Sequence, residues 1–160
     1  RMGLCYELGK GVSKSFTDAA KWYRLSAEQG DEYAQYNLGY LYENGLGIAK
    51  DLMEAAKWYA KASEKGLSQA QGNLGRCYEY GYGVTKDLVE AAKWYRKASE
   101  QGYMLAQYYL GLLYEDGRGV TKDFVEVVKK DCPQIPYYLN MDVDKSKNTD
   151  SEYLDSWNRW

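Results

Sequence analysis

Residues 31–66 read DEYAQYNLGYLYENGLGIAKDLMEAAKWYAKASEKG, and residues 67–102 read LSQAQGNLGRCYEYGYGVTKDLVEAAKWYRKASEQG. The two segments share an L-G pair, a G-x-G turn and a W-Y pair at the same places. Trp22, Trp58 and Trp94 extend this register over the chain at a constant step of 36 residues. Repetition at about 20 to 50 residues is typical of solenoids, whose units bury their apolar faces only against their neighbours.

The step of 36 residues also predicts the organisation of the 160-residue chain. A repeat region over 1–130 divides into a partial unit, two complete units and a truncated unit, at 1–30, 31–66, 67–102 and 103–130. The pattern fails after Glu126, because Lys130 stands at the Trp position and Pro133 cannot continue a helix. We therefore predict a short second helix over 123–131 and an irregular linker over 131–148.

Each complete unit is predicted to form two helices joined by a glycine turn. The apolar residues of the first helix recur at helical spacing in the first complete unit: Ala34, Leu38, Leu41 and Tyr42. Gly39 lies inside this helix although glycine costs about 1 kcal/mol there relative to alanine. We expect the cause to be the close approach of a neighbouring helix backbone. Gly45 and Gly47 are expected to end the helix and turn the chain.

The second helix of each unit begins with the signature of a capping box, in which an acidic N-cap precedes Glu by three residues. The pairs are Asp51 with Glu54, Asp87 with Glu90, Asp123 with Glu126 and, in a weaker form, Ser15 with Asp18. This pattern predicts that the N-cap and the Glu satisfy each other's backbone N–H groups.

The combined motif resembles a known repeat family. The residues follow A-x-x-x-L-G-x-x-Y-x-x-G-x-G, then D-x-x-x-A-x-x-W-Y-x-x-A, as in the Sel-one-like repeat (SLR), a relative of the tetratricopeptide repeat. The resemblance covers residues 1 to about 130. It implies an all-α fold, a right-handed α/α superhelical solenoid of helix-turn-helix repeats. It also implies adaptor or scaffold roles, known in endoplasmic-reticulum-associated degradation, signalling and bacterial–host contacts.

Composition argues against several classes of function. The net charge of −2 lacks the basic excess typical of nucleic-acid binding, and no stretch has the roughly 18 consecutive apolar residues of a membrane span. The chain has no histidine, the commonest general base and neutral metal ligand. Neither the serine motifs of β-lactamases nor a phosphate-binding loop occurs. We expect no enzyme activity, no cofactor or metal site, no small-molecule substrate, no nucleic-acid binding and no membrane insertion.

The resemblance places the first helix of each unit on the concave surface, and we expect the partner to bind there. Side chains opposite the apolar stripe vary between units while the framework does not. The residues that we predict to bind the partner are Tyr33, Tyr36, Tyr40, Arg76, Tyr80, Tyr108 and Leu112. An acidic ladder is expected near the rim, at Glu7, Glu43, Glu79 and Glu115. This face would suit a peptide with apolar anchors and some basic residues. Tyr42, Tyr78, Tyr114 and the repeat tryptophans are expected to pack between helices instead.

Two functions remain open on the sequence alone. One is a non-catalytic adaptor that binds a protein or peptide in a tyrosine-rich concave groove. The alternative is a structural repeat spacer within a larger multidomain signalling or regulatory protein. The oligomeric state is left open.

The C-terminal sequence TDSEYLDSWNRW places Tyr153, Trp157 and Trp160 at helical spacing. A helix over 149–160 could cap the solenoid or dock on another molecule, and a disordered tail is the third reading. Arg1 stands where a natural chain would begin with Met, so we expect the natural N-terminus to lie upstream. Cys5 and Cys77 fall two units apart, too far for a disulfide. Free thiols and the absence of a visible signal peptide favour a cytoplasmic location.

Overall fold

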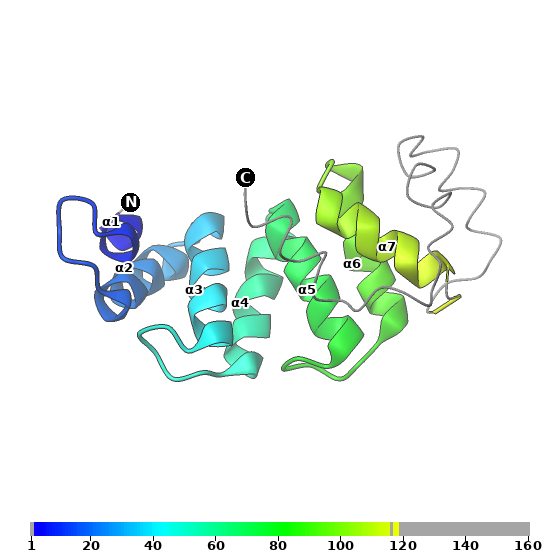
Figure 1. Ribbon diagram of the computed structural model, residues 1–160, viewed down its shortest axis with the longest axis horizontal. Helices are drawn as coiled ribbons and strands as arrows, with labels where there is room; N and C mark the ends of the chain where they lie inside the picture. Colours follow the sequence, from blue (N-terminus) through cyan, green and yellow to red (C-terminus); the bar gives the residue numbers. More distant parts are fainter. Residues whose placement is uncertain (1, 116, 119–160) are drawn as a thin grey trace, which may run out of the picture.

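A computed structural model describes residues 2–115 and 117–118 of the chain, and over these residues it contains seven helices and no strand. The helices are α1 (Met2–Leu8), α2 (Phe16–Glu28), α3 (Glu32–Asn44), α4 (Leu52–Glu64), α5 (Ser68–Tyr80), α6 (Leu88–Glu100) and α7 (Met104–Glu115). They follow one another along the long axis, and each packs mainly against its neighbours in sequence (Figure 1). The predicted all-α repeat solenoid is confirmed. The elements expected at 123–131, 131–148 and 149–160 lie outside the described residues.

The two helices of a unit form where the sequence predicts them. The stripe of α3 is buried as expected, with Leu38 and Leu41 fully covered. Gly45 then ends α3 in the left-handed region at φ 68°, and its N–H donates to the carbonyl of Leu41. Only glycine adopts this conformation without a steric cost, so the turn occurs at the first glycine of the G-x-G motif.

The glycines inside the first helices α1, α3 and α5 make room for a tyrosine ring, and at Gly39 the neighbouring backbone that the sequence predicted is close as well. A Cβ built on Gly39 would lie 2.9 Å from Cδ1 and Cε1 of Tyr59, with the carbonyl oxygen of Ala55 next at 3.2 Å. On Gly75 the same atom would lie 2.7 Å from Cδ1 of Tyr95. The tyrosine of the W-Y pair thus lies flat on the glycine. A side chain at that position would displace it.

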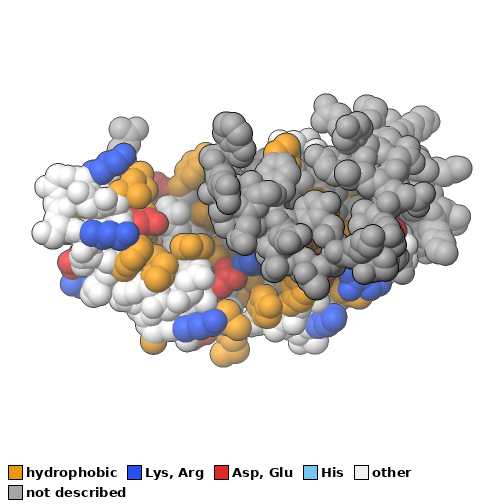
Figure 2. Space-filling model, in the orientation of Figure 1, with side chains coloured by type: hydrophobic (Ala, Val, Ile, Leu, Met, Phe, Trp, Pro, Cys, Tyr) orange, Lys and Arg blue, Asp and Glu red, His pale blue; other side chains and the backbone are white. Residues whose placement is uncertain are grey.

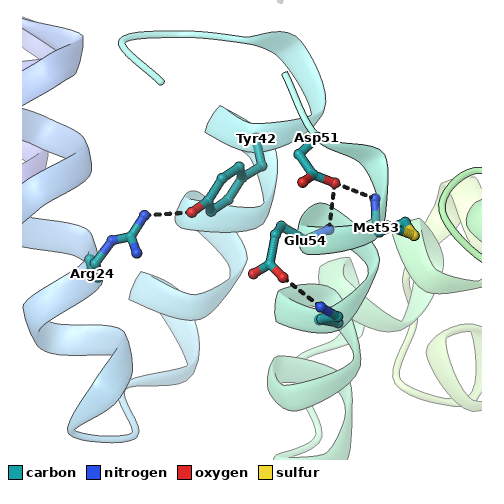
Figure 3. Close-up of polar contacts among 6 residues, drawn as sticks. Arg24, Tyr42, Asp51, Met53 and Glu54 are labelled. Atoms are coloured by element: carbon teal, nitrogen blue, oxygen red, sulfur yellow. Dashed lines mark hydrogen bonds and ion pairs between the residues drawn. The ribbon is translucent and has the colours of Figure 1, made fainter. Parts of the chain in front are cut away.

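In the predicted capping box of Asp51 and Glu54, the N-cap side chain makes its hydrogen bonds but the Glu side chain does not. Asp51 Oδ1 accepts hydrogen bonds from the N–H groups of Met53 and Glu54, as an N-cap should (Figure 3). Glu54 does not return the bond, because its carboxylate accepts from Lys57 Nζ at 2.6 Å. The Asp51 N–H donates instead to the carbonyl of Tyr42 at 3.0 Å, which ties α4 to the end of α3.

The second glycine of the G-x-G motif forms the joint between successive units. A Cβ on Gly47 would overlap the backbone of Phe16 and Thr17, where α2 begins. A Cβ on Gly83 would overlap the carbonyl group of Leu52, where α4 begins. Both glycines also have positive φ, 66° and 71°. Each turn therefore lies directly against the start of the second helix of the preceding unit.

A recurring glutamine, which the sequence reading missed, joins the units at the opposite helix end. Gln35 Nε2 donates to the carbonyl of Ala27 at 3.1 Å, and Gln71 Nε2 donates to that of Ser63 at 3.2 Å. Gln107 repeats the bond. The last carbonyls of a helix lack partners within the helix, so each glutamine caps the helix that precedes it. The step of 36 residues between these glutamines was the available signal.

Replacing Gln71 with Leu should destabilise the protein by about 0.5–1.5 kcal/mol, because the carbonyl of Ser63 loses its side-chain donor and keeps only backbone donors such as the N–H of Gly66. The matched control is Gln69→Leu on the exposed side of the same helix, with an expected change of within about 0.5 kcal/mol. Urea unfolding followed by circular dichroism measures both. Equal stabilities of the two variants would show that the cap contributes nothing.

The repeat tryptophans are not all packed between helices, as the sequence reading expected. Trp58 is only 8% exposed, whereas Trp22 is 41% exposed. Trp94 of α6 packs against the core cluster that contains Trp58, so this position faces the preceding unit. Trp22 of α2 lies in the first described unit. Lys61 and Lys97 lie over the rings of the other two tryptophans, at 4.1 and 4.2 Å from the centroids.

The two described cysteines are free thiols, as expected. Cys77 is buried in α5 and Cys5 is half-buried in α1. Burial raises the pKa of the Cys77 thiol to about 12. The thiolate is the reactive form of cysteine, so Cys77 is an inert part of the core.

Candidate binding surface

The side chains opposite the apolar stripes of the first helices include many tyrosines, and we call this set of positions the tyrosine face. Its members recur at one set of positions in each unit and include Leu4, Leu8, Tyr33, Tyr36, Tyr40, Arg76, Tyr80, Leu105, Tyr108 and Leu112. Four of the predicted binding residues are exposed there: Tyr33 by 61%, Tyr40 by 42%, Tyr80 by 51% and Tyr108 by 50%. Tyr36, Arg76 and Leu112 are half-buried. Figure 2 shows hydrophobic side chains between isolated charged ones on one side of the molecule.

The centre of this face is a charged network rather than a free cation. Glu43 of α3 accepts a hydrogen bond from the Tyr59 hydroxyl at 2.7 Å and forms an ion pair with Arg76 of α5. The predicted central cation is therefore already neutralised by a neighbouring unit. This ion pair joins α3 to α5 across two successive units.

The prediction of an acidic ladder near the rim is wrong if it means four carboxylates that are open to solvent. Glu79 is only 5% exposed, accepts from the Tyr95 hydroxyl at 2.8 Å and lies 3.8 Å from Arg118. Glu7 likewise accepts from the Tyr23 hydroxyl. Only Glu115 of the four is exposed. The recurring glutamates hold the tyrosines that lie on the helix glycines, so their step of 36 residues reflects packing.

The aromatic rings of the tyrosine face contact one another in pairs. Tyr80 stacks on Tyr82 with the centroids 5.5 Å apart, and Tyr108 meets the edge of Tyr109 at 5.5 Å. Tyr109 stacks in turn on the buried Tyr95 at 5.4 Å. These contacts limit the number of rotamers available to the exposed rings. Less side-chain entropy is then lost when a ligand binds.

Tyr103 belongs to this surface although the sequence reading missed it. A Cβ built on Gly72 would lie 2.6 Å from Cε1 of Tyr103. The ring therefore covers the position that Tyr36 and Tyr108 occupy in the other units. Burial raises the pKa of both Tyr36 and Tyr103. Glycine at position 72 was the available signal, because an absent side chain leaves room for another ring.

The tyrosines expected to pack between helices mostly do so. Tyr42 and Tyr114 are buried, and Tyr78 is half-buried. Arg24 of α2 donates to the hydroxyl of Tyr42 (Figure 3), and Arg96 of α6 donates to that of Tyr114 at 2.7 Å. The equivalent residue in α4 is Ala60, whose side chain cannot donate a hydrogen bond. The bond that Arg24 and Arg96 form to Tyr42 and Tyr114 therefore has no counterpart from Ala60 to Tyr78.

A shallow pocket of about 360 Å³ lies away from the tyrosine face, between α2 and the turn that follows α3. Its lining includes Lys21, Arg24 and Glu28 beside Leu25 and Ile48. These residues include no His, Cys or Ser nucleophile and no convergent pair of carboxylates. No group of three or more potential metal-ligating side chains occurs within residues 2–115 and 117–118. The pocket therefore offers no recognisable arrangement for catalysis.

Comparison with known proteins agrees with this architecture. The Sel1 repeat profile matches residues 1–31, 32–67, 68–103 and 105–126. The chain belongs to the Sel1 repeat family. Sel1 repeats typically mediate protein–protein interactions, and they are generally non-catalytic scaffolds. In the described part of this Sel1 repeat chain, no helix has the length and apolar character needed to cross a bilayer.

Two solved structures share the fold of this Sel1 repeat chain. The protein c5321, a protective antigen of uropathogenic Escherichia coli strains that displays an SLR fold, is 41% identical with a TM-score of 0.74. The match covers 74% of this chain and 26% of that protein. A Sel1 repeat protein from Oxalobacter formigenes is 44% identical with a TM-score of 0.73, over 76% of this chain and 50% of that one.

One curated relative of the Sel1 repeat chain is viral. The putative sel1-like repeat-containing protein L21 of Acanthamoeba polyphaga mimivirus is 51% identical over 39 residues. That match covers 24% of this chain and 7% of the relative. The chain thus spans half or less of each of these three proteins.

Proposed function

We propose that this chain is a non-catalytic adaptor module that binds a protein or peptide on the tyrosine face. The observation that carries the proposal is the exposure of Tyr33, Tyr40, Tyr80 and Tyr108 along the first helices. Tyrosine supplies a large contact area and a polar tip at a low cost in side-chain entropy, so it is common among the residues that dominate interfaces.

The packing beneath the tyrosine face supports the proposal that its exposed rings bind a partner. The framework beneath it is held by Tyr–Glu hydrogen bonds, a half-buried one at Glu43 of 2.7 Å and a buried one at Glu79 of 2.8 Å. The rings above it are then presented by a rigid surface that need not reorganise when a partner binds. Its side chains differ between units, so successive units can contact different parts of one partner.

Panning of a random peptide library displayed on phage against the purified chain tests the proposal. The wild-type chain should enrich peptides whose binding is lost when Tyr40, Tyr80 and Tyr108 are replaced together with Ala. The matched control replaces exposed residues of the second helices, Met53→Ala with Val89→Ala, and should enrich the same peptides as the wild type. Circular dichroism confirms that each variant is folded.

The second candidate is a structural repeat spacer in a larger protein. It is favoured by the matches themselves, because each relative above is longer than the segment that this chain matches. A spacer requires no selective surface. Enrichment that is absent, or equal for the tyrosine variant and the wild type, would reject the adaptor and leave the spacer.

A further inference from the structure

We infer that α5 is a point of local opening near the middle of the solenoid, and that the ion pair of Glu43 with Arg76 is the latch that keeps it closed. Helices lie on both sides of α5 along the row (Figure 1). In a solenoid each unit is stabilised by its own structure and by its contacts with its neighbours. A weak helix in the row can therefore open while the units on either side stay folded.

The sequence of α5 makes it a weaker helix than α3, its equivalent in the preceding unit. Its N-cap is Leu67, which forms no side-chain capping bond. Asp31, in the same place before α3, accepts a hydrogen bond from the N–H of Ala34 at 2.8 Å. Gly72 and Gly75 both lie inside α5, whereas α3 contains one interior glycine. A missing cap and a second interior glycine each lower the stability of a helix.

The joint between α4 and α5 lacks a bond that the neighbouring joints have. Between α2 and α3, Arg24 donates to the hydroxyl of Tyr42. Between α6 and α7, Arg96 donates to that of Tyr114. The equivalent residue of α4, Ala60, cannot donate. The glutamine caps occur at all three joints, so they do not compensate for this difference.

An ion pair ties this joint on the other side of α5. Arg76 of α5 pairs with Glu43 of α3, and the two side chains are 34% and 15% exposed. Arg76 and Tyr78 are two residues apart, so their side chains leave the helix about 200° apart. The joint is therefore held, on the side away from the missing bond, by an ion pair that solvent can reach. Dissolved salt weakens such pairs.

Opening at α5 changes the tyrosine face, whatever the partner is. Tyr33 and Tyr40 belong to α3 and Tyr108 belongs to α7, so the two groups lie on either side of α5. When α5 opens, the two groups can move relative to each other, and the solenoid can fit partners of different width. Elements of low local stability are the usual source of such motions.

Hydrogen–deuterium exchange followed by mass spectrometry tests the inference. If all units were equally stable, α3 would exchange faster than α5, because the ends of a repeat array fray first. We expect the reverse: after correction for intrinsic rates, peptides from α5 exchange at least about tenfold faster than those from α3. Raising NaCl from about 0.05 to about 1 M should widen this ratio about threefold or more. Equal rates, or slower exchange in α5, overturn the inference.

Variants at two positions separate the joint from the latch. Ala60→Arg supplies the donor that the neighbouring joints have, so it should slow exchange in α5 about three- to tenfold. Ala60→Leu adds bulk without a donor and is the matched control, with an expected change of within about twofold. Arg76→Met removes the charge but keeps an unbranched stem, so α5 should exchange faster and lose its dependence on salt.

Two results with these variants would also overturn the inference. One is equal exchange of α5 in Ala60→Arg and Ala60→Leu, and the other is a salt effect that persists in Arg76→Met. Circular dichroism confirms that each variant is folded. If Arg76→Met does not fold, the salt series on the wild type and the pair of variants at position 60 still decide.

Discussion

Replacing Gly83 with Ala is expected to destabilise the protein by about 3 kcal/mol or more. The residue has a φ of 71°, and a Cβ there would overlap the carbonyl group of Leu52 and lie 2.7 Å from the nitrogen of Met53. The left-handed backbone contributes about 1–2 kcal/mol to this loss, and overpacking contributes about 1–3 kcal/mol. Urea unfolding followed by circular dichroism measures the change.

The same turn contains a matched control for Gly83. Gly81 has a φ of 77°, but the nearest atom to a Cβ there is Lys86 Cβ at 3.5 Å, an ordinary contact. Gly81→Ala should therefore show only the backbone cost of about 1–2 kcal/mol. The difference between the two variants isolates the contact between successive units. If both variants lose the same stability, the joint at Gly83 is not a tight one.

Alkaline solution should destabilise the protein over the range in which Cys77, Tyr59 and Tyr95 ionise in the unfolded chain. Burial, and then the hydrogen bonds to Glu43 and Glu79, raise the pKa values of Tyr59 and Tyr95 well above the ordinary value. Burial raises the pKa of Cys77 to about 12. The folded chain therefore keeps these groups neutral, whereas the unfolded chain ionises them near pH 8.5 for Cys and near pH 10 for Tyr.

The sign of the effect follows from proton binding. Above these unfolded-state pKa values the folded chain binds more protons than the unfolded chain, so the free energy of unfolding falls as pH rises. The stabilisation is fully present below about pH 8 and decreases by about 1.4 kcal/mol per pH unit for each ionising group. Urea unfolding at a series of pH values from 8 to about 12 measures the slope.

Two double variants serve as controls for the alkaline prediction: one removes two buried tyrosine hydroxyls and the other removes two exposed ones. Tyr59→Phe with Tyr95→Phe should flatten the slope above about pH 10 and also lower stability at pH 7, since each Glu loses a donor. Tyr33→Phe with Tyr40→Phe removes exposed hydroxyls and should leave the slope unchanged. A slope that is equal in both double variants would contradict the assignment to the buried tyrosines.

The fold could be predicted because its determinants repeat in the sequence. The apolar stripe that includes Leu38, the turn glycine Gly45 and the N-cap Asp51 each depend on local geometry that one unit reveals by itself. Local rules failed where a residue's partner lies in another helix. Gly39 was assigned to a backbone contact because nothing in its own helix points to the Tyr59 ring. Gln71 was missed because its acceptor, the carbonyl of Ser63, belongs to the preceding helix.

The candidate surface shows the same limit. The positions of Tyr33, Tyr40, Tyr80 and Tyr108 opposite the apolar stripe were enough to predict that they are exposed. The electrostatics of the surface could not be read in this way. Glu43 and Arg76 are 33 residues apart in sequence, and only the folding of successive units brings them together. A regular series of glutamates looked like a charged rim, although Glu7, Glu43 and Glu79 each accept a hydrogen bond from a tyrosine of the second helix.

The joints at Gly47 and Gly83 also bear on how such a protein can change in length. Each turn meets the start of a second helix in an equivalent way, and the two joints lie one period of 36 residues apart. Excision or duplication of a segment between equivalent positions would rebuild the same joint from residues that already fit each other. Unequal recombination can thus add or remove a whole unit in one step, while point substitutions on the tyrosine face diversify the copies afterwards.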